Sequence, residues 1–93
     1  MTEISASLPT ALHQVRKAKN LSQEAFSEVS SRTYMSSLER GLKSPTIKKI
    51  EAICSVLNVH PLTLLTLAYS GDGSVSSSNL LNLVKRQIEE LDL

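Results

Sequence analysis

The chain has 93 residues, which is enough for one small hydrophobic core and too few for a deep catalytic cleft, so an enzyme is not expected. Hydrophobic residues make up 41% of it, but no apolar run approaches the length of a membrane helix, and we expect a globular protein without a membrane span. The net charge is only +1, but residues 1–69 hold eight basic and five acidic side chains, against two and four in residues 70–93. The positive charge therefore lies in the larger, N-terminal part.

One cysteine excludes an internal disulfide, and together with two distant histidines it cannot supply the four ligands of a structural zinc site. Cys54 shares a helical spacing with Ile50 and Leu57, so we interpret it as a core side chain and not as a nucleophile with His60 as its base. The N-terminus lacks the basic and apolar regions of a secretion signal. We expect a cytoplasmic protein without metal or cofactor.

The first predicted helix covers residues 8–19, with Ser7 as its cap and Asn20 as a left-handed closing residue. A second, short helix is predicted over 23–29, and Ser22 is its expected N-cap. Both segments are followed by polar residues that break a helix, so they form two separate short elements.

A third predicted helix ends at Gly41, and its apolar and polar residues separate on a helical wheel. The apolar side is formed by Met35, Leu38 and Leu42. The opposite side and its flanks carry Thr33, Ser36, Ser37, Arg40, Arg32 and Glu39. Hydroxyls and arginine suit the base edges of a DNA major groove, although such residues also occur on ordinary solvated surfaces.

A fourth helix is predicted over residues 47–57, capped by Thr46. Its inward stripe comprises Ile47, Ile50, Ile53 or Cys54, and Leu57. We interpret Lys48 and Lys49 on its outer side as solubilising charges, and phosphate contacts are the alternative.

Pro61 opens a fifth predicted helix, 62–69, which has leucine on more than one side. Residues 70–79 are rich in glycine and serine and are predicted to be a linker, and 80–93 hold an amphipathic helix. That helix packs on its own domain or on a partner's, or it binds another protein. The apolar surface predicts a homodimer, whose expected interface comprises Leu62, Leu65, Tyr69, Leu81, Val84 and Ile88.

Several motifs occur in a fixed order between Leu12 and Leu65. They are Leu12, Val15 and Arg16, then LSQE at 21–24, SRTYMSSLERG at 31–41, Ser-Pro-Thr at 44–46, and an Ile-rich helix that ends in Leu57-Asn58-Val59. In these motifs the chain resembles the Xre or Cro/C1-type helix-turn-helix family of bacterial and phage regulators. The resemblance implies an all-α, five-helix lambda-repressor-like domain, here followed by a short C-terminal helix.

The resemblance also implies a sequence-specific regulator of transcription, a repressor or autoregulator, which binds double-stranded DNA at a near-palindromic operator as a homodimer. The expected base-reading residues are Arg32, Thr33, Ser36 and Ser37. The expected phosphate contacts are Gln23, Arg40, Lys43, Ser44 and Lys19. A structural ion pair is implied between Arg16 and Glu39. The alternative function is a protein-interaction adapter or antitoxin that uses the same fold to bind another protein.

The turn between the second and third predicted helices is shorter than in most family members and lacks their glycine. Phe26 and Met35 are only nine positions apart, and Ser30-Ser31 stands where the glycine is expected. We expect Val29 to be the apolar residue of this turn. The shortening predicts either a tighter second helix or a changed angle of the third.

Overall fold

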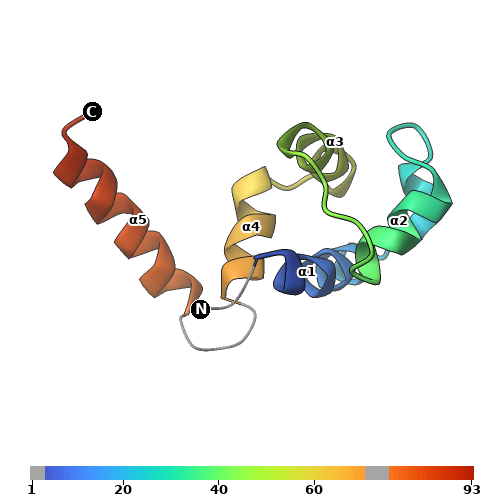
Figure 1. The fold of residues 1–93 in the computed structure, drawn as a ribbon, viewed down its shortest axis with the longest axis horizontal. Helices are drawn as coiled ribbons and strands as arrows, with labels where there is room; N and C mark the ends of the chain where they lie inside the picture. Colours follow the sequence, from blue (N-terminus) through green and yellow to red (C-terminus); the bar gives the residue numbers. More distant parts are fainter. Residues whose placement is uncertain (1–3, 71–75) are drawn as a thin grey trace.

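The computed structural model describes residues 4–70 and 76–93, with side chains from Leu8 onward in these ranges. Its regular elements are all helical, which confirms the all-α fold (Figure 1). In chain order they are α1 (Ile4–Ala18), the 3₁₀ helix η1 (Gln23–Phe26), α2 (Arg32–Glu39), α3 (Ile47–Leu57), α4 (Pro61–Tyr69) and α5 (Ser77–Leu91).

Most of the predicted helix ends are confirmed. Asn20 and Asn58 adopt the left-handed conformation after α1 and α3, with φ of 59° and 57°. Thr46 begins α3 with its hydroxyl accepting a hydrogen bond from a backbone N–H in the first turn. Ser22 is the N-cap residue of η1, as predicted, but its side chain makes no capping hydrogen bond.

The starts of α1 and α5 differ from the predicted ones. Helix α1 begins at Ile4, so Ser7 lies inside the helix and is not its cap. Helix α5 begins at Ser77, after an N-cap at Ser76, so residues 77–79 are helical and do not belong to a linker. The rest of the predicted linker, residues 71–75, lies outside the described residues.

The short turn tightens the second helix, as expected. In place of a helix over 23–29 there is a four-residue 3₁₀ helix, and the backbone N–H groups of Val29 and Ser30 both donate to the carbonyl of Phe26. Val29 packs against the core. Among the described non-glycine residues only Asn20, Asn58 and Asp92 have positive φ, so Ser30 and Ser31 avoid the strain that a left-handed serine would carry.

The hydrophobic core lies between α1, η1, α2, α3 and α4. Its buried side chains are Leu8, Ala11, Leu12, Val15, Phe26, Met35, Leu38, Ile50, Ile53, Cys54, Leu57, Leu64 and Ala68. Helix α1 packs most extensively on α4 and also contacts α2. This arrangement holds α2 at one end of the domain, beside α1 (Figure 1).

Two apolar residues expected in the core are exposed. Leu42 is 64% exposed because α2 ends at Glu39 and Gly41, with φ of 75°, turns the chain away from the helical path. Ile47 is 75% exposed; it is the first residue of α3 and lies three positions before Ile50, the first residue that α3 buries. The stripe that α3 does bury is Ile50, Ile53, Cys54 and Leu57.

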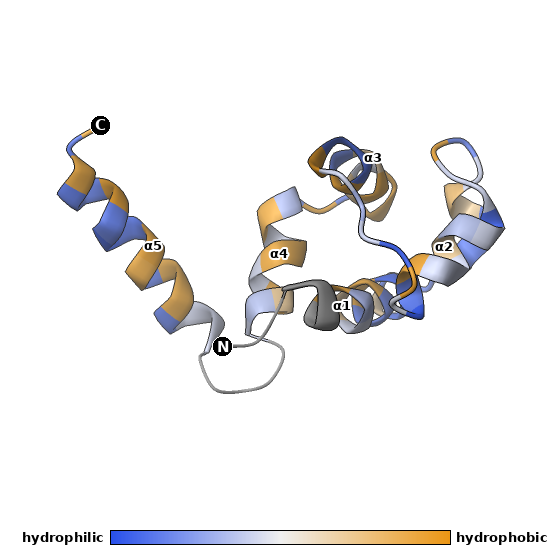
Figure 2. Ribbon diagram, in the orientation of Figure 1, coloured by the Kyte–Doolittle hydropathy of each residue, from blue (hydrophilic) through white to orange (hydrophobic). Residues whose placement is uncertain are grey.

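Helix α5 projects from the rest of the domain and contacts α4 (Figure 1). None of its residues is buried, and an apolar stripe runs along one side of it (Figure 2). The Cα radius of gyration is 14.0 Å, larger than the value of about 12 Å for a compact chain of this length, because α5 extends the molecule.

Among the described residues no single helix has the length and apolar composition to cross a membrane. Helices α3 and α4 meet that criterion only when taken together, and the chain bends by 107° between them.

Candidate nucleic-acid interface

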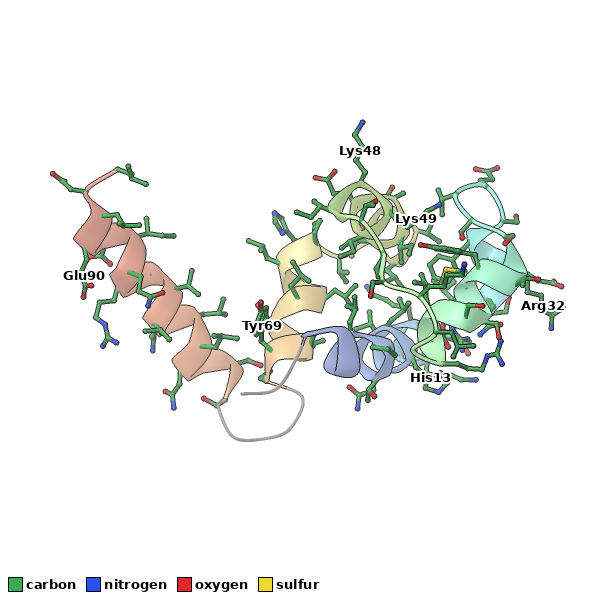
Figure 3. All side chains as sticks on the ribbon, in the orientation of Figure 1. His13, Arg32, Lys48, Lys49, Tyr69 and Glu90 are labelled. Atoms are coloured by element: carbon green, nitrogen blue, oxygen red, sulfur yellow. The ribbon has the colours of Figure 1, made fainter. Side chains whose placement is uncertain are left out.

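Helix α2 presents two different faces. Met35 and Leu38 are buried, at 0% and 3% exposed, whereas Arg32 and Thr33 are exposed to solvent. Ser36 is half-buried at the border between the two faces. Arg32 points outward at the end of the molecule formed by α2 (Figure 3). The first turn of α2 therefore carries a guanidinium and a hydroxyl that are both exposed to solvent.

Ser37, one of the residues expected to read bases, is only 9% exposed, so its hydroxyl offers little surface for a base contact. Helix α2 contacts both α1 and η1, and its buried residues are Met35, Ser37 and Leu38, so the face that it buries includes a serine beside the apolar stripe. A helical wheel drawn from hydropathy cannot distinguish a serine covered by a neighbouring helix from one that faces solvent.

Arg16 and Glu39 form the ion pair that the family resemblance implies. Nε of Arg16 donates to Oε2 of Glu39 at 2.6 Å and Nη2 donates to Oε1 at 2.8 Å, which is the two-bond geometry of a guanidinium on a carboxylate. Both side chains are nearly inaccessible, at 7% and 5% exposed. The third nitrogen, Nη1, donates to the carbonyl of Leu21 at 2.8 Å, so Arg16 joins α1, the segment before η1, and α2.

Two further residues, His13 and Gln23, contact the same carboxylate and were not predicted. Because a carboxylate oxygen can only accept, Nδ1 of His13 donates to Oε1 of Glu39 at 2.9 Å, and Nε2 of Gln23 donates to it at 3.4 Å. The position of His13 three residues before Arg16, on the same side of α1, is the signal that places it near Glu39.

These contacts fix the charge states of the pair. Burial raises the pKa of Glu39, but the hydrogen bonds from Arg16 and His13 and the charge of Arg16 outweigh it, so the pKa lies below its ordinary value. The hydrogen bond to Glu39 is also the main reason that the pKa of Arg16 is raised. Both groups are therefore charged at neutral pH.

Arg32 is not free of partners. Its Nη1 donates to Oε1 of Glu24 on η1 at 3.0 Å, and both side chains are about 70% exposed. An exposed ion pair of this kind contributes little to stability. It does restrict the guanidinium to the side of α2 that faces η1.

The residues expected to contact phosphates come from the turn after α1 and the start of η1, from the end of α2 and from the loop before α3. Gln23, Arg32 and Lys17 line an open hollow of about 440 Å³ between the end of α1 and the start of η1. Lys19 is exposed in the turn that follows α1. Arg40 is exposed after α2, with its Nε near the carbonyl of Ser36, and Lys43 and Ser44 are exposed in the loop before α3.

A family model described as helix-turn-helix matches residues 12–64, which is more than half of the chain. The chain belongs to the Cro/C1-type helix-turn-helix family. The regulator therefore has the lambda-repressor-like fold and is a DNA-binding regulator of transcription. Comparisons with curated proteins and with solved structures gave no match.

In this helix-turn-helix regulator the two lysines of α3 differ in position. Lys48 points away from the domain, whereas Lys49 lies on the side of α3 that faces the turn after η1 (Figure 3). Nζ of Lys49 donates to the carbonyl of Val29 at 2.7 Å. The interpretation of Lys49 as a merely solubilising charge is therefore wrong.

Cys54 and His60 serve the fold of the regulator. Cys54 is 1% exposed, and burial raises the pKa of its thiol, as expected of a core side chain. His60 is the N-cap of α4, where its Nδ1 accepts a hydrogen bond from the backbone N–H of Leu62. Among the described residues there is no cluster of three metal-ligating side chains.

The residues expected at a dimer interface are mostly exposed. Leu62 and Tyr69 on α4 are 60% and 51% exposed. On α5 the exposed fractions of Leu81, Val84 and Ile88 are 51%, 43% and 54%. Leu65 differs, because it is partly buried against the core of its own domain. The regulator thus carries an apolar surface at the end opposite to α2 (Figure 2).

Proposed function

We propose that the protein is a repressor or autoregulator that binds a near-palindromic operator as a homodimer, with α2 in the major groove of each half-site. The exposed first turn of α2, with Arg32 and Thr33 outward and Met35 and Leu38 buried, is the observation that carries the proposal. A guanidinium can bond to both acceptors of a guanine, and a hydroxyl can bond to a base edge.

Sequence preference is assigned to Arg32, Thr33 and Ser36, and no base contact is assigned to the buried Ser37. The ion pair with Glu24 orients Arg32, so this carboxylate influences which base the guanidinium reaches. Phosphate contacts are assigned to Lys19, Arg40 and Lys43, together with the neutral side chains of Gln23 and Ser44.

The salt dependence of DNA affinity tests this proposal. Three cations per protomer make six in a dimer, so the logarithm of the association constant should fall with the logarithm of salt concentration with a slope of about −5. A monomer would give about half that slope. The measurement uses operator DNA selected from genomic fragments, and random DNA of equal length serves as the reference.

The proposed homodimer uses the apolar side of α5 and the adjoining exposed residues of α4. Binding both halves of one operator requires the two copies of α2 to lie about 34 Å apart, one turn of DNA, or a multiple of that distance. Replacing Ile88 by lysine should convert the dimer to a monomer in sedimentation experiments, because the charge would be buried in the interface. Asn82→Lys adds the same charge on the opposite side of α5 and should leave the dimer intact.

An adapter that binds another protein is the second candidate, and the exposed apolar stripe of α5 is the observation that favours it. A flat salt response, no preference for any DNA sequence, and a monomer at micromolar concentration would together support the adapter and reject the repressor.

A further inference from the structure

Lys49 joins three elements through one ammonium group. It is in the first turn of α3, its Nζ donates to the carbonyl of Val29 in the turn after η1, and it lies 5.2 Å from the centre of the Tyr34 ring on α2. The distance to the ring is within the range of a cation–π contact. We call these two contacts the Lys49 tether.

The tether acts on the part of the helix-turn-helix that is unusually short. In the described structure the turn contains a buried hydroxyl, Ser30 Oγ, that makes no hydrogen bond, so its polar groups are not fully satisfied internally. Val29 lies two residues before Ser31, the N-cap of α2. Hydrogen bonds from charged donors are stronger than those between neutral groups, so the ammonium restrains the backbone just before α2 begins.

The second contact acts on α2 directly. Tyr34 is in the first turn of α2, two residues after Arg32 and one after Thr33. Holding both the Val29 carbonyl and the Tyr34 ring fixes the position and the direction of this turn relative to α3. Base recognition requires such control, because binding groups must be held within about 0.5 Å and 10–20° of their productive geometry.

We propose that Lys49 is a positioning residue that sets the angle of α2 for sequence-specific DNA binding without contacting DNA. The inference deepens the proposed function and rests on it. The opposite reading, a phosphate contact by Lys49, requires Nζ to leave the Val29 carbonyl and the Tyr34 ring. The exposed Lys48 next to it carries the same charge without these contacts, which makes it a matched control.

The test compares Lys49→Met, Lys49→Arg and Lys48→Met with the unchanged protein. Affinities for the operator and for random DNA are measured over a range of salt concentrations. We expect Lys49→Met to weaken operator binding at least tenfold, with less than a twofold change for random DNA and an unchanged salt slope. Lys49→Arg should retain most of the operator preference, because arginine can donate to a carbonyl and stack on a ring. Lys48→Met should leave that preference unchanged.

Equal losses on both DNAs, with a salt slope smaller by about 0.9 for each lost phosphate contact, would overturn the inference in favour of direct phosphate binding. Unchanged operator binding by Lys49→Met would also overturn it. If Lys49→Met does not fold, Tyr34→Leu decides. This variant keeps the bond to Val29 and should lower the ratio of operator to random affinity, and an unchanged ratio would reject the inference.

The orientation of α2 is also measured without DNA, from residual dipolar couplings of backbone amides. Lys49→Met should rotate α2 relative to α1 by about 10° or more, which is the tolerance of a positioned site. No rotation would reject the tether even if the unchanged protein binds DNA. A rotation in Lys49→Met, combined with no selective DNA binding by the unchanged protein, would support the tether and reject the proposed function.

Discussion

Replacing Glu39 with glutamine isolates the charge of the ion pair that joins α1 to α2. The two side chains have nearly the same volume, so the core packing is preserved. The Arg16 guanidinium, 7% exposed, would keep its bond to the carbonyl of Leu21 but would lose the carboxylate that faces Nε and Nη2. Removing one partner of a buried ion pair costs about 3–5 kcal/mol.

The free energy of unfolding of a domain this small is about 5–15 kcal/mol, so the loss is a large part of the total. For Glu39→Gln we expect the Tm to fall by about 12 °C or more. Thermal and urea unfolding followed by circular dichroism measure both quantities. Glu28→Gln, at an exposed position in the turn after η1, is the matched control and should change stability by less than about 0.5 kcal/mol.

A double-mutant cycle with Arg16→Met identifies the source of the loss. The double variant leaves no buried charge without a partner, so it should be less destabilised than the sum of the two single variants. If Glu39→Gln costs less than about 1 kcal/mol, or if the two single losses simply add, the pair does not stabilise the fold in the way described.

Three further predictions follow from the same structure. The pKa of Glu39 in the folded protein lies below its ordinary value of 4.5, so the carboxylate contributes fully to stability above pH 4.5, and this contribution is lost as the pH falls through the folded-state pKa. Urea unfolding at a series of pH values should show this loss of stability. Glu39→Gln should not show it. Gly41→Ala should lower the free energy of unfolding by about 1–2 kcal/mol, because φ at this position is 75° and alanine is strained there. The added methyl group causes no clash, since it meets only Pro9 Cγ, at 3.7 Å. Unchanged stability in thermal unfolding would contradict this prediction. Arg32→Ala should weaken operator binding by about 1–3 kcal/mol and relax the preference at one base position in a binding-site selection. Lys43→Ala should weaken the affinity for DNA of every sequence by the same factor. The reverse pattern would refute the assigned roles.

The parts of the fold that could be predicted depend on residues close together in the chain. Asn20, Thr46 and Pro61 mark helix ends through their own backbone preferences or short-range bonds, so their positions follow from sequence. The separation of Met35 and Leu38 from Arg32 and Thr33 depends only on helical periodicity. The ion pair of Arg16 with Glu39 came from the family resemblance, since the two residues are 23 positions apart.

The parts that could not be predicted depend on packing between elements. Leu42 and Ile47 have the right spacing for a buried stripe, but each lies beyond the end or at the very start of its helix. Ser37 is buried although it lies outside the apolar stripe, and hydropathy alone does not show this. The partner of Lys49 is 20 positions earlier in the chain, and no local pattern shows that a lysine on an exposed face will turn toward a carbonyl.

Thr33 is exposed and Ser37, one helical turn further along α2, is buried, so the two positions should differ in the substitutions that they tolerate. Arg32 and Thr33 are exposed, so substitutions there should alter the proposed base contacts and leave thermal stability nearly unchanged. Ser37 is only 9% exposed, so a bulkier residue there should destabilise the fold. Redesign of the target preference should therefore vary Arg32, Thr33 and Ser36 and leave Ser37 unchanged.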